Sequence, residues 1–306
     1  MQPRDNLILD FWDRGNELTV KNKFYADFAG KLSYFLLKED IALGDITTNS
    51  IIKKGKKISA AIVAKEDGIM AGLEEFSMIN DDLKLKFLKK DGEKIKSGEI
   101  LVEITGDAGK ILGNERISLN LLQRMSGIAT NVYKLNKRLD NKIKLAATRK
   151  TLWGLLDKKA VSIGGGLTHR LNLNDGILIK DNHLKILDGN IENLINSAKD
   201  NSKYVEIEVE DKNQALIAAK SISKIIDNKK SKALFAILFD RIPPKEIKLI
   251  IDEFKKLAIC GKILFEASGN ISEGNMLSYV DCGADIVSMG SITNSAKIIN
   301  MSLEIK

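Results

Sequence analysis

Charged side chains gather at the ends of short apolar runs in the second half of the chain. Between residues 148 and 183 they comprise four cations and both histidines of the sequence: Arg149, Lys150, His169, Arg170, Lys180 and His183. Each close pair of cations in a partly dehydrated cavity is destabilised by roughly several kcal/mol of repulsion. A polyanion removes that repulsion. These residues therefore indicate a pocket for a carboxylated or phosphorylated molecule.

Two carboxylates follow at later strand ends. Glu208 lies in the run 204–209, where acidic and apolar residues alternate, and Asp240 ends the run 233–239. Alternating acids normally mark a solvated strand face, but a strand covered by helices has no such face. We therefore expect at least one of these acids to point into the mouth of a barrel. Such oxygens can hold a divalent metal or face a developing positive charge.

Small residues end the last two runs. These are Ser268, Gly269, Asn270, Gly290 and Ser291. Barrels commonly place a phosphate on backbone N–H groups at this position. The residues alone therefore predict two substrates, a phosphate ester and a carboxylate-bearing molecule, and a reaction that builds positive charge near two acids.

The apolar runs must position these residues. Seven runs alternate with helix-like segments, at residues 143–147, 160–163, 176–179, 204–209, 233–239, 262–265 and 285–289. Strands alternating with helices predict a parallel sheet, and this number suits a β/α barrel one strand short of eight. A doubly wound open sheet is the alternative, but no Gly-x-Gly-x-x-Gly follows a strand.

The first third of the chain has a different pattern. A helix is predicted over residues 23–38, followed by strand-like runs at 58–63, 83–88 and 99–104 separated by turns. A long helix is predicted over 115–140. Its apolar stripe is Ile117, Leu121, Met125, Ile128, Val132, Leu135 and Leu139.

The amino-acid composition narrows the class of protein and its location. With 44% apolar and 29% charged residues the chain is typical of a globular protein, and its net charge of +7 attracts anions. Cys260 and Cys282 form no metal or disulfide pattern, so we expect reduced thiols and a cytoplasmic protein. No signal peptide is evident, and no apolar run approaches the roughly 20 residues of a membrane span.

Taken together, the motifs resemble the carboxylating nicotinate-nucleotide pyrophosphorylases, also called quinolinate phosphoribosyltransferases. The resemblance covers nearly the whole chain. In order, it rests on Glu39-Asp40, Gly44-Asp45-Ile46-Thr47-Thr48, Glu115-Arg116, Leu119-Asn120, Ser126-Gly127-Ile128-Ala129-Thr130, Thr148-Arg149-Lys150-Thr151, Gly164-Gly165-Gly166, His169-Arg170, Leu178 to His183, Glu206 to Glu210, Asp240 and Ser268-Gly269.

The resemblance implies an α/β fold, with an N-terminal α/β sandwich domain and an open, incomplete β/α barrel. The expected boundaries are 1–113, joined by 292–306, for the first domain and 114–291 for the catalytic barrel. The implied reaction converts quinolinate and phosphoribosyl pyrophosphate, with Mg²⁺ and no organic cofactor, to nicotinate mononucleotide, pyrophosphate and CO₂. A homodimer with shared active sites, possible higher assembly, and no nucleic-acid or membrane partner are implied as well.

The resemblance also implies roles for single residues. Arg149, Lys150, His169, Arg170 and Lys180 would bind the two carboxylates of quinolinate, and Arg116 would reach into the partner subunit's site. Glu208 and Asp240 would hold ribose and metal and face the oxocarbenium-like transition state. Ser268, Gly269, Asn270, Gly290 and Ser291 would hold the 5′-phosphate. The residues expected to act in catalysis are Lys150, Lys180, Glu208 and Asp240.

The chain departs from the family pattern at five positions. Trp153 stands where Pro is usual, Leu156 where Arg is usual, and Leu167 where a polar residue or His is usual. Arg241 stands where Asn is usual, and Asn270 where a second Gly is common. The first four are expected to reshape the pocket rim.

Three alternatives stay open at this point. A sibling enzyme of the molybdenum-operon type would use another base. A barrel aldolase would form a Schiff base on Lys180. A nucleic-acid binder would need aromatic residues among its cations, but aromatics are only 6% of the sequence.

Overall fold

A computed structural model describes residues 3–187, 189–259 and 261–306. The chain divides into two compact units. The parallel-sheet unit combines the segment ending at Arg14 with residues 135–150 and 166–291, and the antiparallel-sheet unit combines residues 15–134, 151–165 and 292–306.

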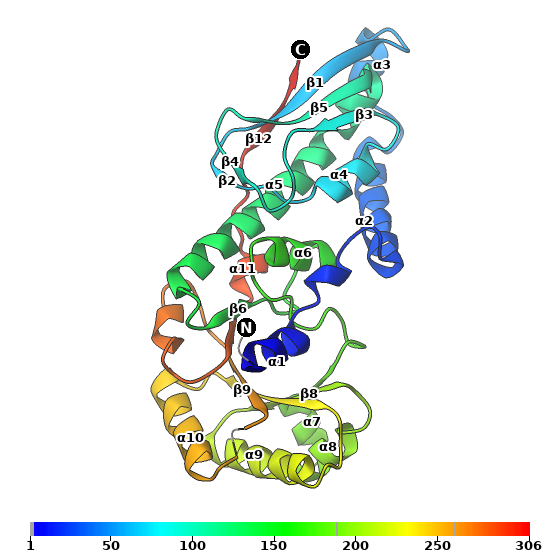
Figure 1. The fold of residues 1–306 in the computed structure, drawn as a ribbon. Helices are drawn as coiled ribbons and strands as arrows, with labels where there is room; N and C mark the ends of the chain where they lie inside the picture. Colours follow the sequence, from blue (N-terminus) through cyan, green and yellow to red (C-terminus); the bar gives the residue numbers. More distant parts are fainter. Residues whose placement is uncertain (1–2, 188, 260) are drawn as a thin grey trace. The chain divides into compact units, whose positions relative to one another are not determined.

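The parallel-sheet unit is built on six strands, in the order β6-β11-β10-β9-β8-β7. They are β6 (Lys144–Ala146), β7 (Ile177–Ile179), β8 (Tyr204–Val209), β9 (Leu234–Asp240), β10 (Ile263–Ser268) and β11 (Ile286–Ser288). Between them run α7 (Asp181–Ile186), α8 (Ile191–Ala198), α9 (Lys212–Asp227), α10 (Pro244–Lys256) and the 3-10 turn η2 (Met276–Tyr279), and α11 (Ser291–Asn294) follows β11 (Figure 1). Neighbouring strands are parallel, and β6 and β7 do not pair, so the predicted open barrel is confirmed.

One predicted strand is wrong. The run 160–163 lies in the helix α6 (Leu155–Ile163), which belongs to the antiparallel-sheet unit. Periodicity cannot separate a short buried helix segment from a buried strand. The helix ends where Gly165 adopts a left-handed backbone, with φ of 83°. In place of a seventh strand, Leu167 alone forms a parallel bridge to Ala146.

The first helix, α1 (Pro3–Trp12), covers part of the parallel sheet. Its Ile8, Phe11 and Trp12 are buried in a cluster with the side chains of Ala146, Leu167, Ala236, Leu264 and Ile286. This packing explains why the residues up to Arg14 group with the parallel sheet, whereas the predicted boundary placed them with the N-terminal domain.

The antiparallel-sheet unit contains a four-stranded sheet in the order β12-β1-β5-β3. Its strands are β1 (Lys57–Ala64), β3 (Lys84–Phe87), β5 (Ile100–Asp107) and β12 (Met301–Ile305), and a small pair is formed by β2 (Gly68–Ile69) and β4 (Lys94–Ile95). The unit also contains η1 (Gly15–Glu17), α2 (Lys23–Ile41), α3 (Ile46–Ile51) and α4 (Leu73–Ile79). The end of the chain joins this unit because β12 pairs with β1.

The long predicted helix is α5 (Ala108–Leu139), and all seven residues of its apolar stripe are buried. The helix runs without a break through the predicted domain boundary at residue 113. Contacts accordingly group residues 114–134 with the antiparallel sheet rather than with the barrel.

The cysteines and the helices bear on two further predictions from the sequence. Cys282 is a buried free thiol, and Cys260 lies outside the described residues. Within the described part of the chain, no helix combines the length and the apolar character that a membrane crossing requires.

Asp91 gives the antiparallel-sheet unit a pH-dependent stability. Burial raises the pKa of its carboxyl group to about 6, although the group accepts a 3.1 Å hydrogen bond from the backbone N–H of Leu73. At pH values between the ordinary pKa of aspartate and the raised pKa in the folded protein, the folded chain holds a proton that the unfolded chain has released. Stability therefore falls as pH rises through this window, by about 2–3 kcal/mol in total.

We expect Asp91→Asn to remove that loss, because the amide keeps the acceptor oxygen without a titratable charge. The measurement is the urea unfolding midpoint of both proteins at several pH values between about 4 and 7. The wild-type midpoint should fall more steeply than that of the variant. Parallel pH profiles would contradict this assignment.

Candidate active site

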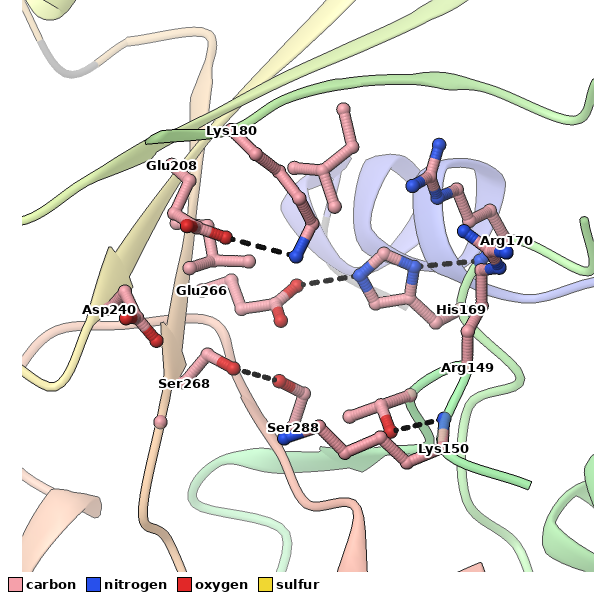
Figure 2. Close-up of a pocket in the computed structure, with 14 residues that line it drawn as sticks. Arg149, Lys150, His169, Arg170, Lys180, Glu208, Asp240, Glu266, Ser268 and Ser288 are labelled. Atoms are coloured by element: carbon pink, nitrogen blue, oxygen red, sulfur yellow. Dashed lines mark hydrogen bonds and ion pairs between the residues drawn. The ribbon is translucent and has the colours of Figure 1, made fainter. Parts of the chain in front are cut away.

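A cavity of about 360 Å³ lies at the carboxyl ends of the parallel strands (Figure 2). It is lined by Thr148, Arg149, Lys150, His169, Arg170, Leu178, Lys180, Glu208, Leu238, Asp240, Glu266, Ser268, Gly269 and Ser288. Among these are nine of the residues singled out in the sequence: Arg149, Lys150, His169, Arg170, Lys180, Glu208, Asp240, Ser268 and Gly269.

The two-residue period of the strands explains how the acids reach the cavity. On β9, Leu238 and Asp240 continue the face that begins at the buried Ala236. The register pairs Asp240 with Ser268 and Leu238 with Glu266 on the neighbouring β10. One face of the sheet is therefore apolar where α1 packs and polar at the strand ends.

The cations lie mainly opposite these acids. Figure 2 shows Arg149 and Arg170 on one side of the cavity, facing Glu208 and Asp240 on the other. Burial and then the charge of Arg149 lower the pKa of Arg170, although the carboxyl groups of Glu206 and Asp175 act in the opposite direction. Lys180 is partly neutralised because its Nζ lies 3.2 Å from Oε2 of Glu208.

Lys150 lies at the rim of the cavity, close to Gly290. Its N–H donates a 3.1 Å hydrogen bond to the hydroxyl of Thr148. A Cβ atom at Gly290 would lie 2.9 Å from Cδ of Lys150, so a larger residue there would require the lysine side chain to shift. Gly290 thus contacts a residue that lines the cavity.

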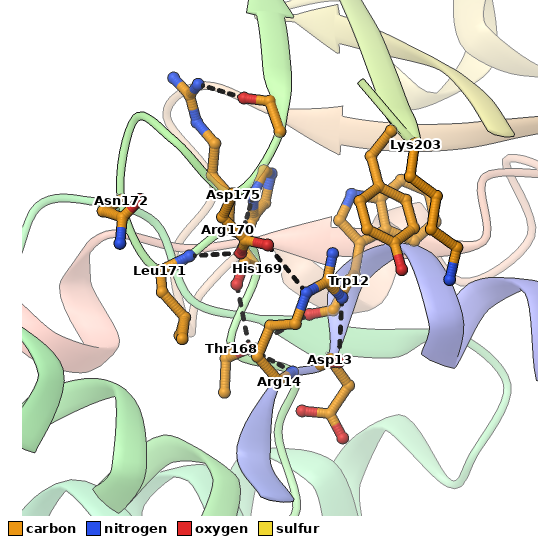
Figure 3. A network of polar contacts seen from close by, with 12 residues as sticks. Trp12, Asp13, Arg14, Thr168, His169, Arg170, Leu171, Asn172, Asp175 and Lys203 are labelled. Atoms are coloured by element: carbon orange, nitrogen blue, oxygen red, sulfur yellow. Dashed lines mark hydrogen bonds and ion pairs between the residues drawn. The ribbon is translucent and has the colours of Figure 1, made fainter. Parts of the chain in front are cut away.

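The segment that carries His169 and Arg170 is not a strand, and the end of α1 supports it (Figure 3). The N–H of His169 donates to the carbonyl of Trp12 at 2.7 Å, and the N–H of Arg14 donates to the hydroxyl of Thr168 at 2.8 Å. The Arg14 guanidinium also forms a 3.0 Å ion pair with Asp175. These contacts hold the segment in place of the hydrogen bonds that a strand would form with its neighbours.

A pair of buried acids lies beside His169. Its Nε2 is 3.0 Å from Oε2 of Glu266 and 3.4 Å from Oε2 of Glu206. Burial and the charge of Glu266 raise the pKa of Glu206 well above its usual range. Burial acts the same way on Glu266, but its contacts with His169, Ser288 and Glu206 together lower the pKa of this carboxyl group. Of the two carboxyl groups, Glu206 is therefore the one that holds a proton more readily.

Four of the predicted site residues do not line the cavity among the described residues. Arg116 lies on α5 in the antiparallel-sheet unit, and Asn270, Gly290 and Ser291 lie beyond the strand ends. Their roles stay predictions.

Two residues of the lining, Glu266 and Ser288, were given no role by the sequence, although Glu266 stands at the end of a predicted strand. The signal for Glu266 was present, because it interrupts an apolar strand at the same alternate position as the acids of β8. Ser288 gave no signal in the sequence.

Comparison with known proteins adds an independent observation. The model of the quinolinate phosphoribosyl transferase N-terminal domain matches residues 45–126, and that of the C-terminal domain matches residues 128–304. The chain belongs to the quinolinate phosphoribosyltransferase family.

Relatives of this family match over almost their full length. The probable carboxylating nicotinate-nucleotide pyrophosphorylase of Methanocaldococcus jannaschii is 40% identical over 91% of this chain and 98% of its own. That of Bacillus subtilis is 37% identical over 90% and 92%. The solved structure from Francisella tularensis is 31% identical and covers 92% of this chain and 96% of its own, with a TM-score of 0.80.

The departures from the quinolinate phosphoribosyltransferase pattern, which are expected to reshape the pocket rim, do not lie in the lining of the cavity. Within the described part of the chain, none of Trp153, Leu156, Leu167 and Arg241 lines the cavity. Trp153 and Leu156 belong to the other unit, Leu167 is part of the core under the cavity, and Arg241 forms ion pairs with Asp240 and Glu210.

Backbone conformation accounts for the residues that are usual at two of these positions. Arg241 and Asn270 adopt left-handed backbones with φ of 57° and 55°. Asn and Gly adopt this conformation more easily than other residues, which fits the Asn and Gly common there in the family. Arg241 pays a small conformational cost that its ion pairs offset.

Membership of the quinolinate phosphoribosyltransferase family also decides between the alternatives. A Schiff-base lysine must have its amine free to attack a carbonyl, whereas Nζ of Lys180 lies 3.2 Å from Oε2 of Glu208 in an ion pair. Relatives named as carboxylating enzymes, at 30–40% identity, argue against the sibling with another base.

Proposed function

We propose that this protein joins quinolinate to phosphoribosyl pyrophosphate and releases nicotinate mononucleotide, pyrophosphate and CO₂, a step of NAD biosynthesis in the cytoplasm. The observation that carries the proposal is the division of the cavity, in which cations face acids across one space. A dicarboxylate fits the first side, and a ribosyl group that develops positive charge fits the second.

Quinolinate binding is assigned to the cationic side. Arg149 and Arg170 can each form paired hydrogen bonds with a carboxylate, while Lys150 and Lys180 supply point charges. Because these groups repel one another without a ligand, the dianion removes an unfavourable energy as it binds. The resulting orientation directs the pyridine nitrogen toward the acidic side of the cavity.

The chemistry needs position and charge rather than a covalent nucleophile. The pyridine nitrogen forms a bond to the anomeric carbon while the bond from that carbon to pyrophosphate breaks. Glu208 and Asp240 stabilise the positive charge that develops on the ribose. The product ring is a cationic pyridinium. It accepts the electron pair left when the adjacent carboxylate departs as CO₂, and a proton then replaces CO₂ on that carbon.

The same two acids fit a magnesium ion. Both present hard oxygen ligands in the cavity, whereas the third acid of the lining, Glu266, is paired with His169; two carboxylates suit a cation that keeps waters and substrate phosphate oxygens. Mg²⁺ held by Glu208, Asp240 and the pyrophosphate would neutralise charge on the leaving group.

The 5′-phosphate is assigned to the ends of the last two strands. Ser268 and Gly269 line the cavity, and Gly269 has a left-handed backbone, with φ of 82°, directly after β10. Asn270, Gly290 and Ser291 are proposed to complete this subsite.

A homodimer is part of the proposal. Large apolar side chains are exposed on and just after α2: Phe24, Tyr34, Phe35, Leu43, Ile46 and Ile51. Neighbouring exposed apolar residues are typical of surfaces that another protein covers. We propose that a second copy covers this surface, and that Arg116 enters the partner subunit's site.

Subunit mixing tests the shared site. Arg116→Ala and Lys150→Ala should each lose most of the wild-type turnover when quinolinate is well below saturation. In a hybrid dimer, one site combines Lys150 of the Arg116→Ala subunit with Arg116 of the Lys150→Ala subunit. That site is therefore intact. Unfolding and refolding the two together should restore roughly one quarter of wild-type turnover, since half the dimers are hybrid with one intact site each. No recovery in a mixture shown by mass to contain hybrids would contradict the shared site.

The function itself is tested by product analysis. Purified protein with quinolinate, phosphoribosyl pyrophosphate and Mg²⁺ should form nicotinate mononucleotide and pyrophosphate in equal amounts. Turnover of nicotinate with none of quinolinate would overturn the assignment.

A further inference from the structure

Hydrogen bonds fix the tautomer of His169. Its Nδ1 accepts a 2.7 Å hydrogen bond from the backbone N–H of Arg170, so Nδ1 carries no proton. The ring proton is then on Nε2, which lies 3.0 Å from Oε2 of Glu266 and donates to it. This arrangement also shows why His169, Glu206 and Glu266 are not a metal site, although their ligand atoms lie within 4.8 Å. A protonated Nε2 has no lone pair to offer a metal.

The backbone of His169 depends on these bonds. Its φ of 55° is left-handed, a conformation that costs a residue with a Cβ atom about 1–2 kcal/mol. The N–H of His169 is held by Trp12, and its ring holds the N–H of Arg170. The guanidinium of Arg170 donates at 2.9 Å to the carbonyl of Gly176. The backbone of Arg170 is therefore tied to the orientation of the imidazole ring, and its guanidinium is held by Gly176.

Glu266 is placed to hold that ring. It is buried, with 1% of its surface exposed, and it lies on the rigid strand β10 rather than on a loop. On its other side it contacts Ser288, whose hydroxyl oxygen is 2.8 Å from that of Ser268. One carboxylate thus touches both the histidine of the cationic side and the serine pair at the strand ends (Figure 2).

We propose that Glu266 is a positioning residue of this site: by accepting the Nε2 proton of His169, it fixes the ring that holds Arg170 in place for a substrate carboxylate. The proposal rests on the proposed function of the cavity as a quinolinate site. Glu266 acts through His169, and no direct contact with substrate is required of it.

Two substitutions separate positioning from volume and charge. In Glu266→Gln the amide oxygen can still accept the Nε2 proton. In Glu266→Leu a side chain of similar size accepts nothing and leaves the Nε2 proton buried without its partner. We expect the Leu variant to raise the KM for quinolinate at least about 10-fold, with a smaller change in kcat and in the KM for phosphoribosyl pyrophosphate. The Gln variant should recover most of that loss.

Nitrogen NMR of histidine-labelled protein reads the tautomer directly, because the chain has only two histidines. His169→Gln assigns the signals. His183 is an internal reference, since its Nδ1 accepts the N–H of Lys180 at 2.9 Å. Wild type and Glu266→Gln should show His169 with an unprotonated Nδ1 and a protonated Nε2. In Glu266→Leu the His169 signals should move toward a tautomer mixture while those of His183 stay unchanged.

The outcomes are distinct. Unchanged His169 signals in Glu266→Leu, or changed signals with an unchanged KM for quinolinate, would overturn the positioning role. If Glu266→Leu does not fold, Glu266→Ala, in which water can enter, is compared with Glu266→Gln in the same two measurements. If wild-type protein does not turn over quinolinate, the proposed function fails. The NMR comparison then still reports whether Glu266 fixes His169.

Discussion

Arg170→Ala is expected to raise the KM for quinolinate by roughly 100-fold, which corresponds to about 3 kcal/mol of lost binding. The Arg170 side chain is partly buried, lines the cavity and can form paired hydrogen bonds with one carboxylate. Alanine leaves that carboxylate without its partner in a site where water is scarce. Lys150→Ala should act in the same direction, with a smaller effect because a lysine offers one point charge.

Folding should be affected little by either change. In the free protein burial and the charge of Arg149 disfavour the charged Arg170, so relief of this repulsion should partly offset the loss of its hydrogen bond to Gly176. Arg138→Ala is the matched control, since Arg138 lies in the same unit and pairs with the exposed Glu273. The measurements are steady-state kinetics and thermal unfolding of all three variants. A fall in Tm that accounts for the lost activity would favour a structural role instead.

Asp240→Asn is expected to lower kcat by about 100- to 1000-fold and to change the KM for quinolinate only a few-fold. The substitution keeps the shape of the side chain and removes its charge. That charge is needed most when the ribose becomes cationic, so the loss falls on the transition state rather than on binding. Asp252→Asn, on the exposed face of α10, is the control.

A second variant separates catalysis from simple pairing. The Nε of Arg241 lies 2.8 Å from Asp240, so the aspartate could serve mainly to neutralise this arginine. In that case Asp240→Asn combined with Arg241→Leu would recover activity. We expect the double variant to stay as slow as Asp240→Asn. Recovery to near wild-type kcat would contradict a catalytic role for Asp240.

Much of this site could be predicted from the sequence, because the strands of a parallel sheet share one carboxyl edge. Lys150, Lys180 and Asp240 each follow an apolar run, so their convergence required only that the runs be parallel strands. The fold class followed from the same alternation. Family resemblance supplied the identity of the anion, which the charges alone left open.

The rest depended on contacts that no local pattern contains. The run before His169 is a helix rather than a strand, and His169 reaches the cavity because Trp12 and Arg14 hold its segment. Helix α1 packs under the strand ends although it lies at the opposite end of the sequence. Glu266 was missed because its role appears only when His169 is placed beside it.

The most direct test of the central claim uses quinolinate labelled in the carboxyl group next to the ring nitrogen. Decarboxylation requires a ribosylated, cationic ring, so the protein should release labelled CO₂ only when phosphoribosyl pyrophosphate and Mg²⁺ are both present. One CO₂ should appear for each nicotinate mononucleotide formed. Release of CO₂ without phosphoribosyl pyrophosphate, or turnover of nicotinate with none of quinolinate, would contradict the account.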